Sequence, residues 1–162
     1  MSSRRELFRR LGGHPPTRRP PWTAADFAAG CTGCAACVEA CPEGVLKLGA
    51  GRLVELDLSS AGCTLCGECA SRCEAGLFDG GSAFPWIATI GEACLALAGI
   101  HCRSCQDACE PAAIRFRPAP GGVALAELNS QRCNGCGACL APCPSQAIQL
   151  RALSTKESPR HA

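Results

Sequence analysis

The sequence predicts an α+β protein of two tandem modules, each stabilised by bound groups rather than by a large apolar core. Sixteen of the 162 residues are cysteine, whereas the chain has only five Phe, two Trp and no Tyr. A cysteine content this high is typical of chains held together by disulfides or metal. Each half contains about 50–60 residues, a size at which apolar burial alone leaves stability marginal. The spacing of the cysteines decides between disulfides and metal.

The start of the chain offers no route to an oxidising compartment, where disulfides would form. Residues 1–22 are basic and contain no apolar stretch long enough for a signal-peptide core or a membrane span. The most apolar later stretch, residues 87–100, is interrupted by Gly91, Glu92 and Gly99. We therefore expect a soluble, cytoplasmic protein without a transmembrane segment, whose cysteines are reduced and bound to metal.

Three groups of cysteines share the spacing C-x2-C-x2-C-x3-C. This is the bacterial ferredoxin run, whose fourth cysteine binds the other cluster of a [4Fe–4S] pair. Proline follows the fourth cysteine in two runs, but Glu74 follows Cys73, where we expect a local change of chain direction with ligation intact. The three runs are Cys31, Cys34, Cys37 and Cys41; Cys63, Cys66, Cys69 and Cys73; and Cys133, Cys136, Cys139 and Cys143.

A fourth group of cysteines is irregular, with the spacing C-x7-C-x2-C-x3-C. Its members are Cys94, Cys102, Cys105 and Cys109. A looped-out first ligand is feasible, since each doubling of loop length costs only about 0.6 kcal/mol. Structural zinc is the alternative for C-x2-C units, but zinc sites usually use two pairs separated by a longer spacer. We therefore expect [4Fe–4S] clusters at the three regular runs and a fourth cluster at the irregular one.

The runs occur in pairs, with short apolar segments around a turn between the members of each pair. Strands are expected at residues 44–48 and 53–56 in the first half, and at 113–116 and 123–128 in the second. Each half is therefore expected to be a bacterial-ferredoxin-like, βαβ-type unit with two clusters. The expected ligand sets are Cys31, Cys34 and Cys37 with Cys73; Cys63, Cys66 and Cys69 with Cys41; Cys94, Cys102 and Cys105 with Cys143; and Cys133, Cys136 and Cys139 with Cys109.

The expected domain organisation is a basic helix and Pro-rich spacer (1–22), the first ferredoxin-like domain (23–78), a linker (79–92), the second domain (93–150) and a flexible tail (151–162).

The N-terminal extension differs in charge from the rest of the chain. Residues 1–22 carry six arginines and one glutamate, so this segment has a net charge of +5 and the remainder −3 in a chain of +2. Ligating thiols are deprotonated, which makes the cluster-bearing body more acidic still, and we expect no nucleic-acid partner. Ser3 and Glu6 form a capping box of a short helix, which would form fully only against a partner. The candidate partner-binding residues are Arg4, Arg5, Leu7 and Phe8; the alternative is a solvated basic tail.

Taken together, these features resemble the NapF family of ferredoxin-type accessory proteins of the periplasmic nitrate reductase system. The resemblance runs from Ser3 to Leu150, and its most specific part is Ile90–Cys94 followed by the segment 102–111. It implies a cytoplasmic protein that acts on the precursor of the catalytic subunit of that reductase before export. There it would assist insertion or redox loading of the subunit's iron–sulfur cluster.

Two other functions are compatible with the same cysteines. One is a general polyferredoxin-type electron carrier that serves several redox proteins. The other is an enzyme, which we do not expect, because a catalytic metal needs an open coordination position and four thiolates can close every cluster here. The three histidines are isolated from one another, and no pair of nucleophile and base is apparent.

Overall fold

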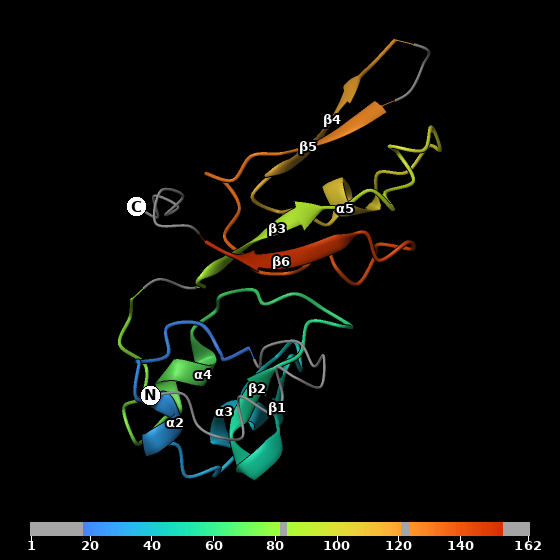
Figure 1. The fold of residues 1–162 in the computed structure, drawn as a ribbon. Coiled ribbons are helices and arrows are strands. Elements are labelled where there is room, and N and C mark those ends of the chain that lie inside the picture. The colour runs from blue at the N-terminus through green and yellow to red at the C-terminus, as the bar shows by residue number, and fades with distance from the viewer. Residues whose placement is uncertain (1–17, 82–83, 121–123, 154–162) are drawn as a thin grey trace.

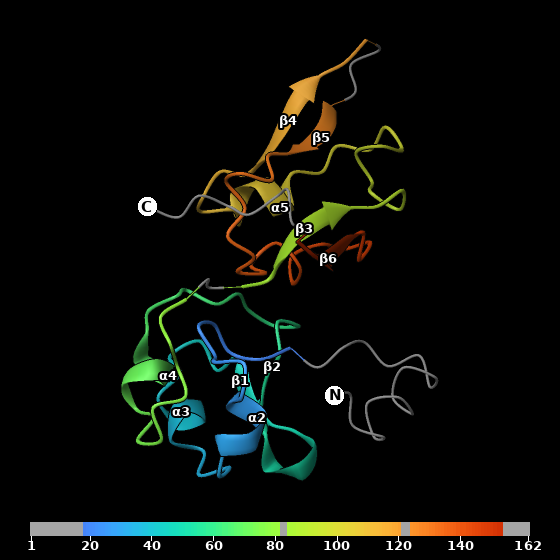
Figure 2. The same cartoon turned by 60° about the vertical axis from the view of Figure 1, so that its left-hand side comes forward.

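The computed structural model describes residues 18–81, 84–120 and 124–153. Figure 1 shows these residues as two modules, the first formed by residues 18–81 and the second by the described residues from 84 onward. Turning the molecule by 60° leaves the division equally clear (Figure 2). The predicted N-terminal helix, with Arg4, Arg5, Leu7 and Phe8, lies outside the described residues.

The first module consists of short helical turns around a small hairpin. Its elements are α2 (Phe27–Gly30), α3 (Ala36–Glu39), β1 (Leu46–Leu48), η1 (Ala50–Arg52), β2 (Val54–Leu56) and α4 (Glu68–Ser71). Strands β1 and β2 pair antiparallel, with Leu46 opposite Leu56. Along these strands the apolar side chains of Leu46, Val54 and Leu56 are buried, whereas Lys47 between them is exposed. This alternation places one face of the hairpin on the core of the module.

The second module has two antiparallel strand pairs and one helical turn. Its elements are β3 (Trp86–Ile90), α5 (Ser104–Asp107), β4 (Ile114–Pro118), β5 (Ala124–Leu128) and β6 (Ile148–Ala152). Strand β4 pairs with β5, so the segments predicted at 113–116 and 123–128 form a hairpin. Strand β3 pairs with β6 over five residue pairs, from Trp86 opposite Ala152 to Ile90 opposite Ile148.

Two features of this fold differ from the sequence prediction. The βαβ-type label is wrong for the strand pairs, because parallel strands need a crossover of a dozen or more residues. Only five residues separate β1 from β2, and all three pairs in the described ranges are antiparallel. Strand β3 lies inside the stretch 79–92 that was expected to be a linker, and its pairing joins it to the second module. The apolar stretch at residues 86–90 is too short for its sequence pattern to distinguish a strand from a connecting segment.

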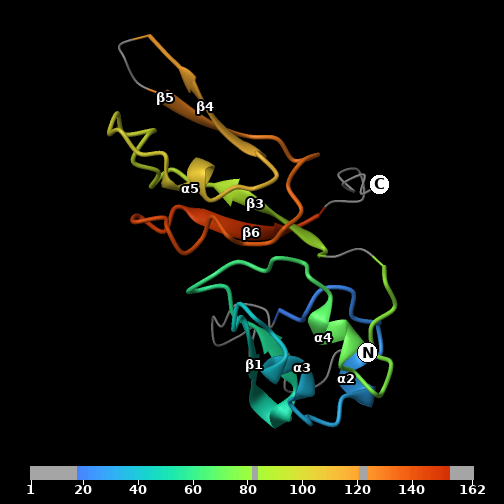
Figure 3. The same cartoon turned by 180° about the vertical axis from the view of Figure 1, so that it is seen from behind.

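Each module has its own buried core, and a few side chains contact both. The first core includes Phe27, Val45 and Val54, and the second includes Ile87 and Ile114. Leu140 and Leu150 of the second module pack against both cores. The view from behind shows the loops of the first module lying directly against β6 and its neighbours (Figure 3). None of the helices in the described ranges is long and apolar enough to cross a membrane.

Candidate iron–sulfur sites

The third cysteine of three runs lies on a short helical turn, which in two of them follows a sharp reversal of the chain. Cys37 lies in α3, Cys69 in α4 and Cys105 in α5, and all three are buried. Ala35 and Gly67, which cap α3 and α4, have φ values of 69° and 82°, in the left-handed region. This reversal lets cysteines three residues apart in sequence face the same space. Each of these short turns therefore carries the third cysteine of its run to the interior.

The fourth cysteine of each regular run in the first module begins a tight turn. The amide of Gly44 donates to the carbonyl of Cys41 at 3.1 Å, and the amide of Gly76 donates to that of Cys73 at the same distance. Both glycines have positive φ, 62° and 63°. The change of chain direction expected at Glu74 is thus absent. The turn depends on the backbone hydrogen bond and on the left-handed glycine. Glutamate fits the position directly after the cysteine as proline does.

Two sets of thiols come together in the first module. Burial raises the pKa of the Cys37 thiol, and three neighbouring thiols raise it further. Those neighbours and Cys37 make up site 1: Cys31, Cys34, Cys37 and Cys73. Burial raises the pKa of Cys69 to about 11, with Cys63 and Cys66 adding to the rise, and the thiols of Cys41 and Cys66 act on Cys63 in the same way. Site 2 accordingly contains Cys41, Cys63, Cys66 and Cys69.

The second module brings together two further sets. Burial raises the pKa of Cys105 to about 11, and the thiols that add to this rise complete site 3: Cys94, Cys102, Cys105 and Cys143. Burial raises the pKa of Cys139 to about 12, with contributions from the other members of site 4: Cys109, Cys133, Cys136 and Cys139. In all four sites the grouping is the one that the spacing predicted, three cysteines of one run with the fourth of its partner run. Ligation by these sixteen cysteines stays a prediction.

Cys94 reaches site 3 by a different route from the first cysteine of a regular run. It lies four residues after the end of β3, where the amide of Gly91 donates to the carbonyl of Ala147 at 2.8 Å. Ala147 in turn donates its amide to the sulfur of Cys143 at 3.3 Å. The β3–β6 pair therefore holds Cys94 and Cys143 beside one another. The seven residues between Cys94 and Cys102 loop away without displacing Cys94, which is only 9% exposed.

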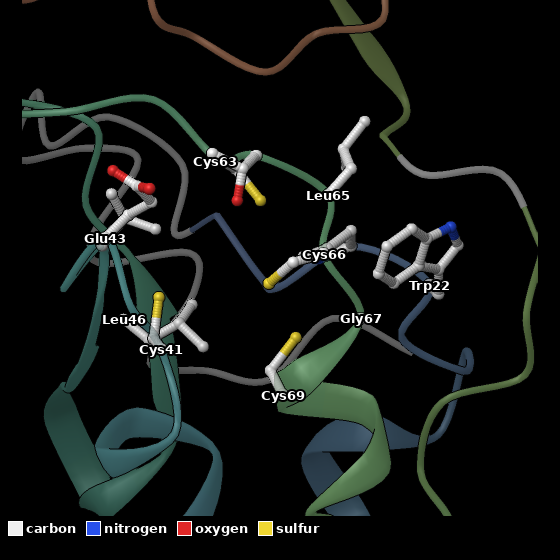
Figure 4. Close-up of a pocket in the computed structure, with 12 residues that line it drawn as sticks. Trp22, Cys41, Glu43, Leu46, Cys63, Leu65, Cys66, Gly67 and Cys69 are labelled. Carbon is white, nitrogen blue, oxygen red and sulfur yellow. The ribbon is translucent and has the colours of Figure 1, made fainter.

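Sites 2, 3 and 4 each surround a hollow. The space between protein atoms is about 320–330 Å³ at each, including the part open to solvent. At site 2 the sulfur atoms of Cys41, Cys63, Cys66 and Cys69 point toward a common space (Figure 4), and Leu46 and Trp22 are among the residues that line it. The hollows at sites 3 and 4 are lined by all four of their cysteines.

The donor set fits an iron–sulfur cluster. Within the described ranges, no group of three or more His, Cys, Asp or Glu side chains is arranged to hold a single metal ion. A [4Fe–4S] cluster binds its four thiolates at different iron atoms, so its ligands surround a larger object than the ligands of zinc do. Four thiols around a hollow meet this requirement. The raised pKa values mean that a buried thiolate without a nearby cation is unfavourable, so the thiols hold their protons. Metal binding releases these protons.

Backbone amides donate hydrogen bonds to three of the sulfurs in the second module. Ala88 of β3 donates to Cys133 at 3.4 Å, Ala113 donates to Cys109 at 3.2 Å, and Ala147 donates to Cys143. Burial raises the pKa of Cys143, but hydrogen bonds from Ala147 and Ser145 outweigh burial and leave this pKa below its ordinary value. Sequence reasoning missed Ala88 and Ser145. Only the strand pairing of β3 brings Ala88 to Cys133, so no local pattern could have identified it.

The cysteine sites and the two modules define a class of protein, the [4Fe–4S] ferredoxin-type proteins. The family model described as a 4Fe-4S dicluster domain matches twice, at residues 30–77 and 100–152. The chain is 46% identical over 134 residues to the ferredoxin-type protein NapF of Escherichia coli K12, covering 80% of this chain and 82% of that protein. Its identity to ferredoxin-type protein NapF of Haemophilus influenzae is 43% over 143 residues, covering 86% and 81% of the two chains.

The chain therefore belongs to the NapF family of ferredoxin-type proteins. One component of an ion-translocating oxidoreductase complex of Methanosarcina acetivorans is 42% identical over a shorter stretch of 52 residues, which covers 32% of this chain and 18% of that protein. The second match to the dicluster domain begins at residue 100, so Cys94 lies outside it. The irregular position of Cys94 is thus a departure from the general dicluster pattern.

Proposed function

We propose that this protein holds four [4Fe–4S] clusters, one at each of sites 1 to 4, and assists maturation of the catalytic subunit of periplasmic nitrate reductase. It would act in the cytoplasm, on the precursor of that subunit, by inserting or redox-loading its iron–sulfur cluster. The observation that supports the cluster part is the gathering of all sixteen thiols into four sets of four. The reductase part rests on membership of the NapF family.

Thiols, backbone amides and apolar side chains have different roles at these sites. The thiolates would hold the clusters, and the amides of Ala88, Ala113 and Ala147 would stabilise negative charge on the sulfurs. Apolar side chains such as Leu65 and Ile114 line the sites and limit the access of water. A bound [4Fe–4S] cluster supplies reversible one-electron chemistry. Because four thiolates can complete each cluster, we propose no catalytic site and no enzyme activity of the protein's own.

A general electron carrier is the second candidate function. The match to a component of an ion-translocating oxidoreductase supports it, because the shared stretch has the length of one two-cluster unit. The two functions differ in how partners are held. A carrier forms transient, salt-sensitive contacts with several redox proteins, whereas a maturation factor holds one immature partner.

Capture of the catalytic subunit of the reductase separates the two candidates. The full-length, iron-loaded chain is immobilised and exposed to the catalytic subunit in its cluster-free and mature forms, at low and at physiological salt. We expect stable capture of the cluster-free form and weak capture of the mature form. Equal and salt-sensitive binding of both forms, together with reduction of several unrelated acceptors, would favour the carrier.

The same assay tests the proposed binding residues at the N-terminus. The double variant Arg4→Glu and Arg5→Glu reverses two charges beside Leu7 and Phe8, and it should weaken capture of the cluster-free form. Lys156→Glu together with Arg160→Glu makes the same charge change near the other end of the chain and serves as the matched control. Equal loss in both double variants would mean that net charge, rather than this segment, governs capture.

A further inference from the structure

The two modules meet through the cysteine loops of site 2 and site 4. The amide of Cys63 donates a hydrogen bond to the carbonyl of Cys136 at 2.9 Å. Cys63 is the first cysteine of its run in the first module, and Cys136 is the second cysteine of its run in the second. Figures 1 and 3 both show the segment that leads into Cys63 on the side of the first module that faces the second. The contact is therefore made by the parts of the chain that carry the thiols.

Gly62 makes this close approach possible. A Cβ atom at this position would lie 2.6 Å from both the Cα and the Cβ of Ala138, which is inside van der Waals contact. From the first module, Leu58 reaches Gly137 in the same way, since a Cβ there would lie 2.5 Å from the Cδ1 of Leu58. Any larger residue at position 62 has to push the two loops apart, because the opposing atoms include the backbone of Ala138.

The loop of site 4 is also held in place by Trp86, at the start of β3. The indole Nε1 of Trp86 donates to the carbonyl of Gly135 at 3.0 Å. The ring of Trp86 stacks on Phe84 with 4.8 Å between centroids, and Phe84 is 3% exposed within the core of the first module. The loop 135–138 thus contacts Leu58 of the first module and Trp86, which itself packs against the core of the first module, so its position relative to site 2 is fixed by packing.

Neighbouring sites share either a buried core or a backbone contact. Cys37 of site 1 and Cys69 of site 2 both belong to the buried core of the first module. The backbone hydrogen bond from Cys63 to Cys136 joins site 2 to site 4. Site 2 therefore has one neighbour in its own module and one in the other module. Sites 3 and 4 share the core of the second module, to which Cys105, Cys133 and Cys139 belong.

We propose that the contact of Gly62 and Cys63 with Cys136 and Ala138 couples the two modules electronically, so that the sites form one series in the order 1, 2, 4, 3. One electron would pass between site 2 and site 4, oxidising the group at the first and reducing the group at the second, with no bond made or broken. Gly62 is the positioning residue, since it sets how closely the two loops approach. This inference rests on the proposed occupation of the four sites, and it does not depend on the reductase as partner.

The test compares two variants of the full-length, iron-loaded chain. Gly62→Leu inserts a side chain between the loops, whereas Ser60→Leu adds the same bulk two residues earlier, at an exposed position. Electron paramagnetic resonance of the fully reduced protein reports magnetic interaction between neighbouring reduced clusters. Coupling within each module is common to both variants, so the difference between their spectra isolates the coupling between modules. Iron content and hydrogen exchange of the Cys63 amide are measured on the same samples.

We expect Gly62→Leu to retain its iron, to exchange the Cys63 amide faster, and to lose the part of the spectral broadening that arises between the modules. Ser60→Leu should match the unmodified protein in all three measurements. A fully loaded Gly62→Leu variant with faster exchange and an unchanged spectrum would overturn the proposal. If Gly62→Leu loses iron, Ala138→Leu applies the same bulk from the other loop and is judged by the same outcomes. All measurements use the isolated chain, so failure here leaves capture of the reductase as a separate question.

Discussion

The two modules share their cysteine turns but differ in the strands that close them. In the second module, β3 before the first cysteine run pairs with β6 after the last one over five residue pairs. At the equivalent place in the first module, the pairing is reduced to a single bridge between Thr23 and Phe78. Phe27 and Phe78 meet edge to face there, with 5.8 Å between centroids. An aromatic contact thus replaces most of a strand pair, and we therefore expect the first module to depend more on bound clusters for its stability.

The irregular site follows from the same difference. In a regular run, the first cysteine is brought to its site by the tight C-x2-C loop itself. Cys94 is instead positioned by the end of β3, and the described part of the first module has no such strand to provide an alternative support. The loop that follows can therefore vary in length, and it exposes Leu97 and Ile100 by 46% and 53%. A complete strand pair makes an irregular ligand spacing possible.

Removal of iron should have the largest effect and should separate the two modules most clearly. Metal-binding energy is folding energy in small cysteine-rich domains, so anaerobic chelation is expected to abolish most of the tertiary structure. We expect amides of the first module, such as that of Cys31, to lose protection before those of β3 and β6. Hydrogen exchange followed by mass spectrometry, with circular dichroism in parallel, measures this order.

Reloading with iron and sulfide provides the control for that experiment, since it should restore protection in both modules. Simultaneous loss of protection in the two modules would show that the β3–β6 pair gives the second module no independent stability. Full protection without iron would show that the thiol sites do not contribute to folding.

Substitution of Cys94 tests the irregular site with an intermediate effect. Cys94→Ser removes one expected ligand of site 3, and loss of that cluster would lower the iron content by about a quarter if four clusters are bound. His101→Ala changes the neighbouring loop without touching a thiol and should retain all iron. The iron content of the purified proteins decides the matter: a Cys94→Ser protein with unchanged iron would remove Cys94 from the ligand set.

The sequence was sufficient to predict the cysteine sets, because the ferredoxin spacing specifies both three local cysteines and the exchange of the fourth between runs. The structure groups Cys73 with Cys31 and Cys143 with Cys94 in this way, although each pair is far apart in the chain. It could not predict β3, since Trp86–Ile90 becomes a strand only through its partner β6. For the same reason the amide of Ala88 on Cys133, and the contact of Gly62 with Ala138, could not have been found. These features depend on how two distant segments pack.

The smallest expected effect concerns the reversal before α3 in the first module. Ala35 has a φ of 69°, whereas the corresponding position of the last run is Gly137, with a φ of 76°. The left-handed conformation costs a residue with a side chain roughly 1–2 kcal/mol of folding free energy. Glycine avoids this cost, but its greater freedom in the unfolded chain cancels part of the gain. We therefore expect Ala35→Gly to stabilise the first module by about 0.5–1 kcal/mol.

Ala29→Gly is the matched control for this prediction, because Ala29 is exposed in the right-handed turn α2. There the same substitution should destabilise the module by about 0.5–1 kcal/mol, since glycine gains only freedom in the unfolded chain. Urea unfolding of the iron-loaded proteins, followed by circular dichroism and by the combined fluorescence of Trp22 and Trp86, measures both effects. Opposite signs would show that backbone strain at Ala35 is a cost that the first module carries and the second avoids at Gly137. Equal signs would mean that the reversal at Ala35 is unstrained, which would leave the strand pairing at their ends as the main difference between the modules.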